Sequence, residues 1–310
     1  MKSAIAVLFA LTIALWGQSE SRTYVFDSEG RRVPWTSSSS SNGVTGASVE
    51  TLNGRKAPLE NVEERLISQQ DGVKTVERLI RRVAPDGTKL PPEREVIETT
   101  DLGGGRQTVT KTVYRGDFNG RMAQAERVVE QTAPAGTSGA TVTTLIDRPS
   151  INGSFQTVEK REARITTGEN RSERDETSYL PDANGRFAEA SRVVERMSKS
   201  GGKTLKQVDE FETALTGRMT LSKQVVSTTT ETAGGEVTVS DVYGTAAAGR
   251  PETGQLQIRE RRVVEKAIGA GGVTETLSVQ RPAVDGSGQL GELRKISETV
   301  CTGKCAPPKP

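Results

Sequence analysis

The sequence predicts an all-β protein made of about eight tandem β-hairpin units of about 33 residues each. Three observations predict it: glycine-containing turns recur at a nearly fixed period, each unit repeats the same internal plan, and the composition is rich in Thr and Val. We expect the units to form one long antiparallel meander, arranged either as a single twisted sheet or as a coiled shell.

The composition indicates a folded chain with a thin core. Leu, Ile, Val and Phe make up about 21% of the residues, close to the level of about 20% below which disorder is common. The high net charge of disordered chains is missing, because 42 Lys and Arg face 40 Asp and Glu. Thr and Val favour strands over helices. The balanced charge and the aromatic content of 4% also disfavour nucleic-acid binding, which needs basic clusters and stacking rings.

The N-terminus has the layout of a cleavable secretory signal peptide. Lys2 supplies the positive charge, an apolar run follows from Ala4 to Leu15, and the small residues Gly17 and Ser19 precede a predicted cut after Ser19. A membrane anchor is the alternative, but this run is too short to cross a hydrocarbon layer of about 30 Å. We therefore assign residues 1–19 to the signal peptide and expect a secreted, periplasmic or cell-surface protein.

Residues 20–50 are expected to contain one strand and a linker. Thr23–Phe26 reads as a short strand beside a stray copy of the repeat's turn. The segment from Thr36 to Ser48 is rich in Ser, Gly and Asn, a composition typical of flexible linkers.

The repeat array covers residues 51–300. Its turn glycines follow one another at spacings of 33, 33, 33, 32, 32, 37 and 34 residues. A period of this size indicates a repeat architecture. The eight turn glycines are Gly54, Gly87, Gly120, Gly153, Gly185, Gly217, Gly254 and Gly288.

A second turn divides each unit into two strands of about ten residues. Asn-Gly, Asp-Gly and Gly-Gly pairs tolerate positive φ at both central positions of a tight hairpin turn. Eight units then give about 16 strands. The second turns are Asp71-Gly72, Gly104-Gly105, Gly201-Gly202, Gly234-Gly235 and Gly271-Gly272.

One hairpin unit buries too little apolar surface to fold alone, so its stability depends on its neighbours in the array. Charges recur within the strands, which keeps at least one face in water. A closed outer-membrane barrel is the alternative architecture. It requires an apolar lipid-facing band, whereas Lys111 lies between Val109 and Val113 and Asp241 follows Val239 with the same alternation. We therefore favour the open sheet or shell.

Three turns share the pattern Tyr-x-x-Asp-x-x-Gly-Arg, beginning at Tyr24, Tyr114 and Tyr179. This pattern resembles the YD repeat of Rhs-type proteins, whose hairpins carry Tyr-Asp before a Gly-Arg turn. The resemblance implies hairpins that wind into a spiral or shell on exported, surface-associated proteins. These units are longer than YD repeats, and their Tyr and Asp are not adjacent.

The C-terminal tail, residues 301–310, contains both cysteines of the chain. Cys301 and Cys305 flank Thr-Gly-Lys. On an extended strand they would lie too far apart to bridge, but a turn centred on glycine brings them into range. Because the chain is expected to be exported, we predict a disulfide that closes a terminal loop; two unpaired thiols are the alternative.

The sequence nominates no catalytic residue, no metal site and no cofactor. It contains no histidine, which removes the usual catalytic triads and His-ligated metals. We expect a non-enzymatic structural or binding scaffold whose partner is a cell-surface glycan, lipid or protein, with no transmembrane span after signal cleavage. The alternatives are a secreted hydrolase that uses two carboxylates and a carrier that cradles a lipid or glycan on a curved sheet.

Overall fold

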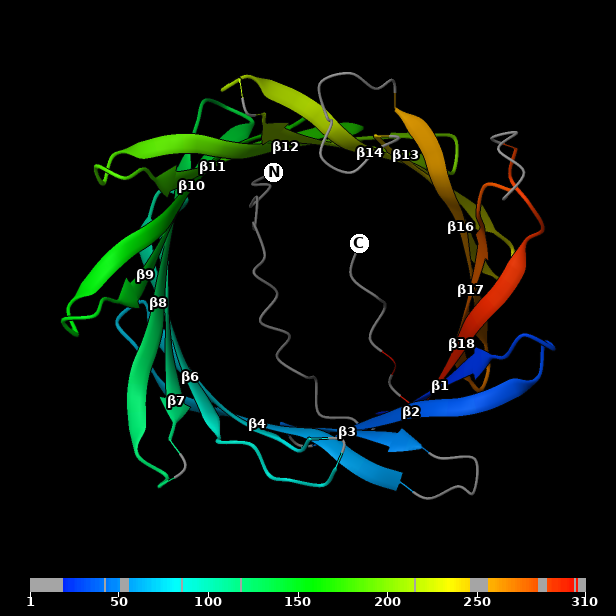
Figure 1. The fold of residues 1–310 in the computed structure, drawn as a ribbon, viewed down its shortest axis with the longest axis horizontal. Coiled ribbons are helices and arrows are strands. Elements are labelled where there is room, and N and C mark those ends of the chain that lie inside the picture. The colour runs from blue at the N-terminus through cyan, green and yellow to red at the C-terminus, as the bar shows by residue number, and fades with distance from the viewer. Residues whose placement is uncertain are drawn as a thin grey trace.

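The computed structural model describes residues 19–41, 43–50, 56–84, 86–117, 119–214, 216–245, 256–283, 289–303 and 305. These residues form 18 antiparallel strands (Figure 1). No helix in these ranges is long and apolar enough to span a membrane. The strands are β1 (Ser19–Phe26), β2 (Arg32–Ser41), β3 (Val44–Glu50), β4 (Lys56–Gln70), β5 (Val73–Arg82), β6 (Glu93–Gly103), β7 (Arg106–Gly116), β8 (Met122–Pro134), β9 (Gly139–Pro149), β10 (Phe155–Thr167), β11 (Arg171–Pro181), β12 (Phe187–Ser200), β13 (Lys203–Thr213), β14 (Met219–Thr232), β15 (Gly235–Gly244), β16 (Gln257–Gly269), β17 (Gly272–Gln280) and β18 (Arg294–Gly303).

The predicted meander is present, but it closes into a barrel instead of remaining an open sheet or a shell. Each strand pairs with its neighbour in sequence, and β1 pairs with both β2 and β18. Figure 1 shows the resulting ring viewed along its shortest axis. The rejection of a closed barrel was therefore wrong. It rested on charges that conflict with a lipid-facing wall, and such charges do not prevent a sheet from closing in water.

The expected linker is replaced by two strands, β2 and β3. Ser37 to Ser41 lie in β2, which pairs with β1 on one side and with β3 on the other. Residues 19–50 thus supply three strands, β1–β3, and the other 15 of the 18 strands lie in residues 56–303. Serine-rich composition favours flexibility only where the backbone has no pairing partner, and here both edges are paired.

The periodic glycines form five-residue turns at one rim of the barrel, which we call the loop rim. In six such turns the glycine N–H donates to the carbonyl three residues before it, at 2.8–3.0 Å, and the glycine φ is 75–88°. This is a type I turn followed by a glycine bulge. Among the described residues of these turns only the glycine has positive φ, whereas both residues of Asp71-Gly72 at the opposite rim have it. The six glycines are Gly30, Gly87, Gly120, Gly153, Gly185 and Gly217; Gly54, Gly254 and Gly288 lie outside the described residues.

A β-bulge follows most of the loop-rim turns at a fixed distance, and the sequence did not predict it. In seven hairpins the extra residue lies five positions after the turn glycine. A bulge bends its strand and increases the local twist, so this repeated bend helps the sheet to close. The seven bulge residues are Trp35, Leu59, Ala125, Val158, Ala190, Ser222 and Arg259.

The strand registers divide the side chains into two faces, one toward the lumen and one outward. Side chains converge on the concave side of a closed sheet, so the lumenal face is the more buried one. Eight of the ten buried apolar side chains among the described residues share one face. The right-handed twist of the sheet, together with the direction in which the register shifts from one strand to the next, indicates independently that this face is the lumenal one. They are Val76, Ile80, Ile97, Val113, Ala140, Val142, Ile146 and Ala163.

The core is thin, as the composition predicts. No described side chain is less than 2% exposed. Eighteen-stranded barrels are wide enough to leave an aqueous channel, so the wall is a single layer of sheet. Its cohesion comes from strand pairing and from polar contacts between neighbouring strands.

Candidate functional site: the polar walls of the barrel

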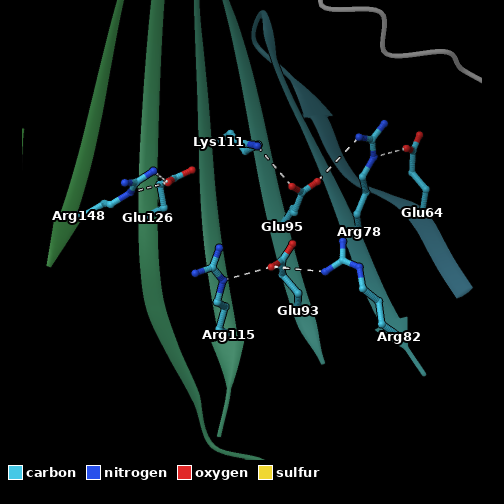
Figure 2. A network of polar contacts seen from close by, with 9 residues as sticks. All are labelled: Glu64, Arg78, Arg82, Glu93, Glu95, Lys111, Arg115, Glu126 and Arg148. Carbon is cyan, nitrogen blue, oxygen red and sulfur yellow. Dashed lines mark hydrogen bonds and ion pairs between the residues drawn. The ribbon is translucent and has the colours of Figure 1, made fainter. Parts of the chain in front are cut away.

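The lumenal face of β4–β9 carries rows of alternating charge (Figure 2). In one row the Arg78 guanidinium donates to Glu64 at 2.6 Å and lies 3.9 Å from Glu95, which also accepts from Lys111 at 3.4 Å. The row forms because antiparallel registers place Glu64, Arg78 and Glu95 side by side on successive strands. Such cross-strand pairs stabilise a sheet without an apolar layer.

A second row runs parallel to the first, nearer the loop rim. Arg82 donates to Glu60 at 2.7 Å and lies 3.9 Å from Glu93, and Arg115 donates to Glu93 at 3.3 Å. On β8 and β9, Arg148 pairs with Glu126 at 2.9 Å (Figure 2). Acids and bases are balanced in these rows, so this part of the lumen offers both donors and acceptors with little net charge.

Glu130, on the lumenal face of β8, is a buried carboxylate without an ion pair among the described residues. It is 8% exposed. Burial raises the pKa of Glu130, and the nearby Glu176 adds to the increase, while Arg174 and a hydrogen bond from Thr144 oppose it. Removing a carboxylate from water without a cation disfavours its charged form.

The lumenal face of β14–β15 and of the closing strands is lined by hydroxyl groups. Ser227 and Ser240 hydrogen-bond at 2.8 Å, as do Thr229 and Thr238. At the seam between β18 and β1, Thr23 and Thr299 hydrogen-bond at 3.0 Å. We call the lumenal face of β4–β9 the charged arc and these hydroxyl-lined stretches the hydroxyl arc. Ion pairs such as Lys223–Glu210 and Lys266–Glu236 also lie on the lumenal face beside the hydroxyls, so all of it is hydrophilic.

The outward face is charged as well, in the middle of its strands. Arg127 holds Asp147 with two nitrogens at 3.1 and 2.9 Å, and β12 and β16 carry similar forked pairs, Arg192–Asp175 and Arg261–Asp241. Forked pairs of this kind are stronger than single contacts.

Glu77 on β5 accepts hydrogen bonds from both Arg65 and Arg94 on the outward face. These bonds keep the pKa of Glu77 below its ordinary value despite the opposing effect of burial.

A shallow hollow of about 550 Å³ indents the outward face across β9–β12. Thr143, Thr177, Tyr179, Glu162 and Glu189 are among the residues that line it. The Tyr179 hydroxyl donates to Glu162 at 3.4 Å. Burial raises the pKa of Tyr179, and the two nearby carboxylates, Glu162 and Glu189, add to the increase.

The predicted disulfide is confirmed. Cys301 and Cys305 are bonded with their Cα atoms 5.9 Å apart. Gly303, with a φ of 85°, forms the turn between them, and its carbonyl accepts from the Cys305 N–H at 2.9 Å. The bridge joins Cys301, which lies in the closing strand β18, to Cys305, two residues beyond the end of that strand.

Other sequence-derived residues have structural positions or lie outside the described part. Asp27, Asp117 and Asp182 each accept hydrogen bonds from two backbone N–H groups of their own turn. In the described ranges no group of three or more Asp, Glu or Cys could hold a metal ion. The signal peptide lies outside the described residues, apart from Ser19, the first residue of β1; cleavage there stays a prediction, as does the resemblance to YD repeats.

Comparison with known proteins shows a fold-level similarity and nothing closer. No known protein family and no curated protein matches the chain. OmpF of Salmonella typhi, in complex with daunomycin, has a TM-score of 0.45 and 10% identity over 93% of this chain and 96% of that one. The translocation pore of the P pilus usher PapC has a TM-score of 0.25 and 10% identity over 94% and 76%, and the toluene transporter TodX of P. putida has 0.25 and 9% over 93% and 87%. With TM-scores below 0.5, these similarities say nothing about what this chain does.

Proposed function

We propose that this chain is an exported, non-enzymatic scaffold whose barrel has water on both sides of its wall, in the periplasm or at the cell surface. The observation that carries the proposal is the charge on the outward face at mid-strand. On β10 the three successive outward residues are Lys160, Glu162 and Arg164. A membrane barrel needs an outward apolar band about 25 Å tall, and an Arg or Lys at its midplane costs about 2–4 kcal/mol.

The distribution of exposed apolar side chains supports the same proposal. In the described part of the chain, the exposed large apolar residues lie near the two rims, in turns or close to strand ends. A lipid-facing wall would show the opposite distribution. Those nearest the loop rim are Trp35, Leu90, Met122, Ile151, Leu180, Phe187, Leu293 and Ile296, and those nearest the other rim are Val44, Leu66, Ile67, Leu102, Leu205 and Ile268.

The two alternatives from the sequence receive less support. A lipid carrier needs an apolar groove, whereas most of the residues that line the hollow on β9–β12 are charged or carry a hydroxyl group. A carboxylate hydrolase needs two acids on either side of a bound substrate. The lumenal acids Glu64, Glu93 and Glu95 are instead held in ion pairs with arginine and lysine.

The proposal is tested with residues 20–310 purified without detergent and mixed with vesicles of phosphatidylethanolamine and phosphatidylglycerol. We expect a monodisperse protein with a strand-rich circular dichroism spectrum that stays below the vesicles in a flotation gradient. Flotation with the vesicles, together with stepwise conductance in a planar bilayer, would contradict the proposal.

Neighbouring residues on β8 provide a matched test for a water-filled lumen. Thr132 faces the lumen and Gln131 faces outward, and neither forms an ion pair. We expect Gln131→Cys to react with maleimides carrying polyethylene glycol of any length, and Thr132→Cys to react with small maleimides but lose reactivity as the polymer grows. Equal reaction of both variants with the largest polymer would show that the sheet is open.

A further inference from the structure

The hollow on β9–β12 differs from the equivalent position at Tyr114 in another repeat. Tyr179 and Tyr114 occupy the same position of the Tyr-x-x-Asp-x-x-Gly-Arg turn, and each ring has a cation above it, Lys160 at 5.7 Å and Arg94 at 5.3 Å. Across the register, Tyr179 pairs with Glu189 on β12, whereas Tyr114 pairs with Gln124 on β8.

The neighbouring strand on the other side differs in the same way. The outward residue that follows Lys160 is Glu162, and the outward residue that follows Arg94 is Val96. One repeat thus surrounds its tyrosine with two carboxylates that the equivalent repeat lacks. No element of the fold requires them, because the repeat at Tyr114 forms the same strands and the same turn without them.

The hollow offers fixed hydrogen-bonding groups of both signs. Arg192 is held by Asp175 through two contacts of 2.8 and 2.6 Å, so its guanidinium is fixed in orientation. In the described part of the chain no ion pair within 4.0 Å engages Glu189 or Arg164, which leaves one acceptor and one donor group for a ligand.

We propose that this hollow binds an uncharged saccharide of a few sugar units. Asp175 neutralises Arg192 and Lys160 neutralises Glu162, which leaves Arg164 to repel a polycation and Glu189 to repel a polyanion. Sugar hydroxyls donate to carboxylates and accept from guanidinium groups, so one neutral ligand satisfies both signs. The tyrosine supplies an apolar surface with a polar tip, and a volume of about 550 Å³ is within the range of small-ligand sites.

This inference rests on the proposed function, because a saccharide reaches the outward face only if that face is in water. A protein that inserts into membranes would remove both proposals. A soluble, monodisperse barrel that binds no saccharide would remove this one and leave the proposed function in place.

The test uses a panel of neutral oligosaccharides of two to four units (glucans, xylans, mannans and N-acetylglucosamine oligomers) with the mature chain, followed by titration calorimetry and saturation-transfer NMR. We expect binding to at least one class, weakened about tenfold or more by Tyr179→Ala and unchanged by the matched variant Tyr114→Ala. Glu189→Gln, a nearly isosteric change, gives a second test in case Tyr179→Ala fails to fold.

Three results would overturn the inference: no binding by any class in the panel at 10 mM sugar, equal weakening by Tyr114→Ala and Tyr179→Ala, or binding that Glu189→Gln and Tyr179→Ala both leave unchanged. A parallel measurement with polylysine and heparin separates simple charge attraction from sugar recognition, because charge-driven binding is abolished by salt.

Discussion

The charged arc of the wall and its closing seam make the same antiparallel pairs with different chemistry. On β4–β9, arginines and lysines bridge carboxylates on both neighbouring strands. At the seam, β1 is held by backbone pairing and by small hydroxyl contacts such as Thr23–Thr299, with Arg32–Glu298 as an ion pair close to it. The comparison teaches that the strands of the charged arc have side-chain contacts to reinforce their pairing, whereas the seam depends mainly on its backbone ladder.

Thr23→Pro should break the seam and have the largest effect. Thr23 pairs with Thr36 on one side and Thr299 on the other, and proline cannot donate a ladder hydrogen bond. We expect a loss of about 3 kcal/mol in the free energy of unfolding and early hydrogen exchange in β1 and β18. Urea unfolding and exchange mass spectrometry measure both.

The control is Ser28→Pro, five residues away. Ser28 is the second residue of the Asp27 turn, a position that accepts proline. Its stability should be unchanged within about 0.5 kcal/mol. A Thr23→Pro variant as stable as Ser28→Pro would show that the seam is not a weak point of the barrel.

Glu77→Gln should weaken the charged part of the wall by about 1–2 kcal/mol, because Glu77 accepts charge-assisted bonds from two arginines that are themselves partly exposed. The pKa of Glu77 is lowered in the folded state. Its contribution is therefore present above the ordinary carboxyl pKa and is lost as the pH falls through the lowered one.

Urea unfolding at pH 7 and pH 2 measures this difference. At pH 2 the difference in stability between the two proteins should be smaller than at pH 7. A constant difference between them at both pH values would show that shape and not charge explains the effect.

Glu130→Gln should have a smaller effect of opposite sign. Because the pKa of Glu130 is raised by burial, the wild-type carboxyl lowers stability as the pH rises above its ordinary value. The amide avoids this cost, so we expect a gain on the order of 0.5 kcal/mol at pH 7 and none at pH 3.

Thermal unfolding at the two pH values provides the measurement. Glu98→Gln, at an exposed outward position of β6, is the control. A destabilised Glu130→Gln protein would mean that the charged form of Glu130 is needed.

Thr229→Val should have the smallest effect. It removes one hydroxyl contact of 2.8 Å to Thr238 but keeps a β-branched side chain that suits a strand. We expect a change of a few tenths of a kcal/mol, insensitive to salt and pH. A salt-dependent change would show that the hydroxyl arc is coupled to the ion pairs.

The hairpins and their turns could be predicted from the sequence, whereas closure could not. Glycine spacing gives the chain reversals directly, since only Gly adopts positive φ freely. Closure depends on small register shifts summed over the whole ring. No characteristic residue type marks the bulge positions, such as Ala125 and Ala190, so the sequence does not reveal them. The Ser-rich segment misled for a related reason, because its serines face hydroxyl partners on neighbouring strands.

The sequence alone indicates only part of the hollow. The pattern at Tyr179 stands out, but Glu162 lies 17 residues earlier and Glu189 lies 10 residues later. Only the registers of β10 and β12 bring them beside the ring. Once those registers are known, comparing the residues that pair with each tyrosine identifies the site.

Most hairpins share the same bulge position, the described loop-rim turns share one geometry, and each strand pairs only with its neighbours around the ring. The number of repeats therefore sets the circumference of the barrel. A gene that gained or lost one segment of about 33 codons would encode a ring of about 20 or 16 strands with the same local structure. Duplication within such a gene would change bore size in steps, without a new fold having to arise.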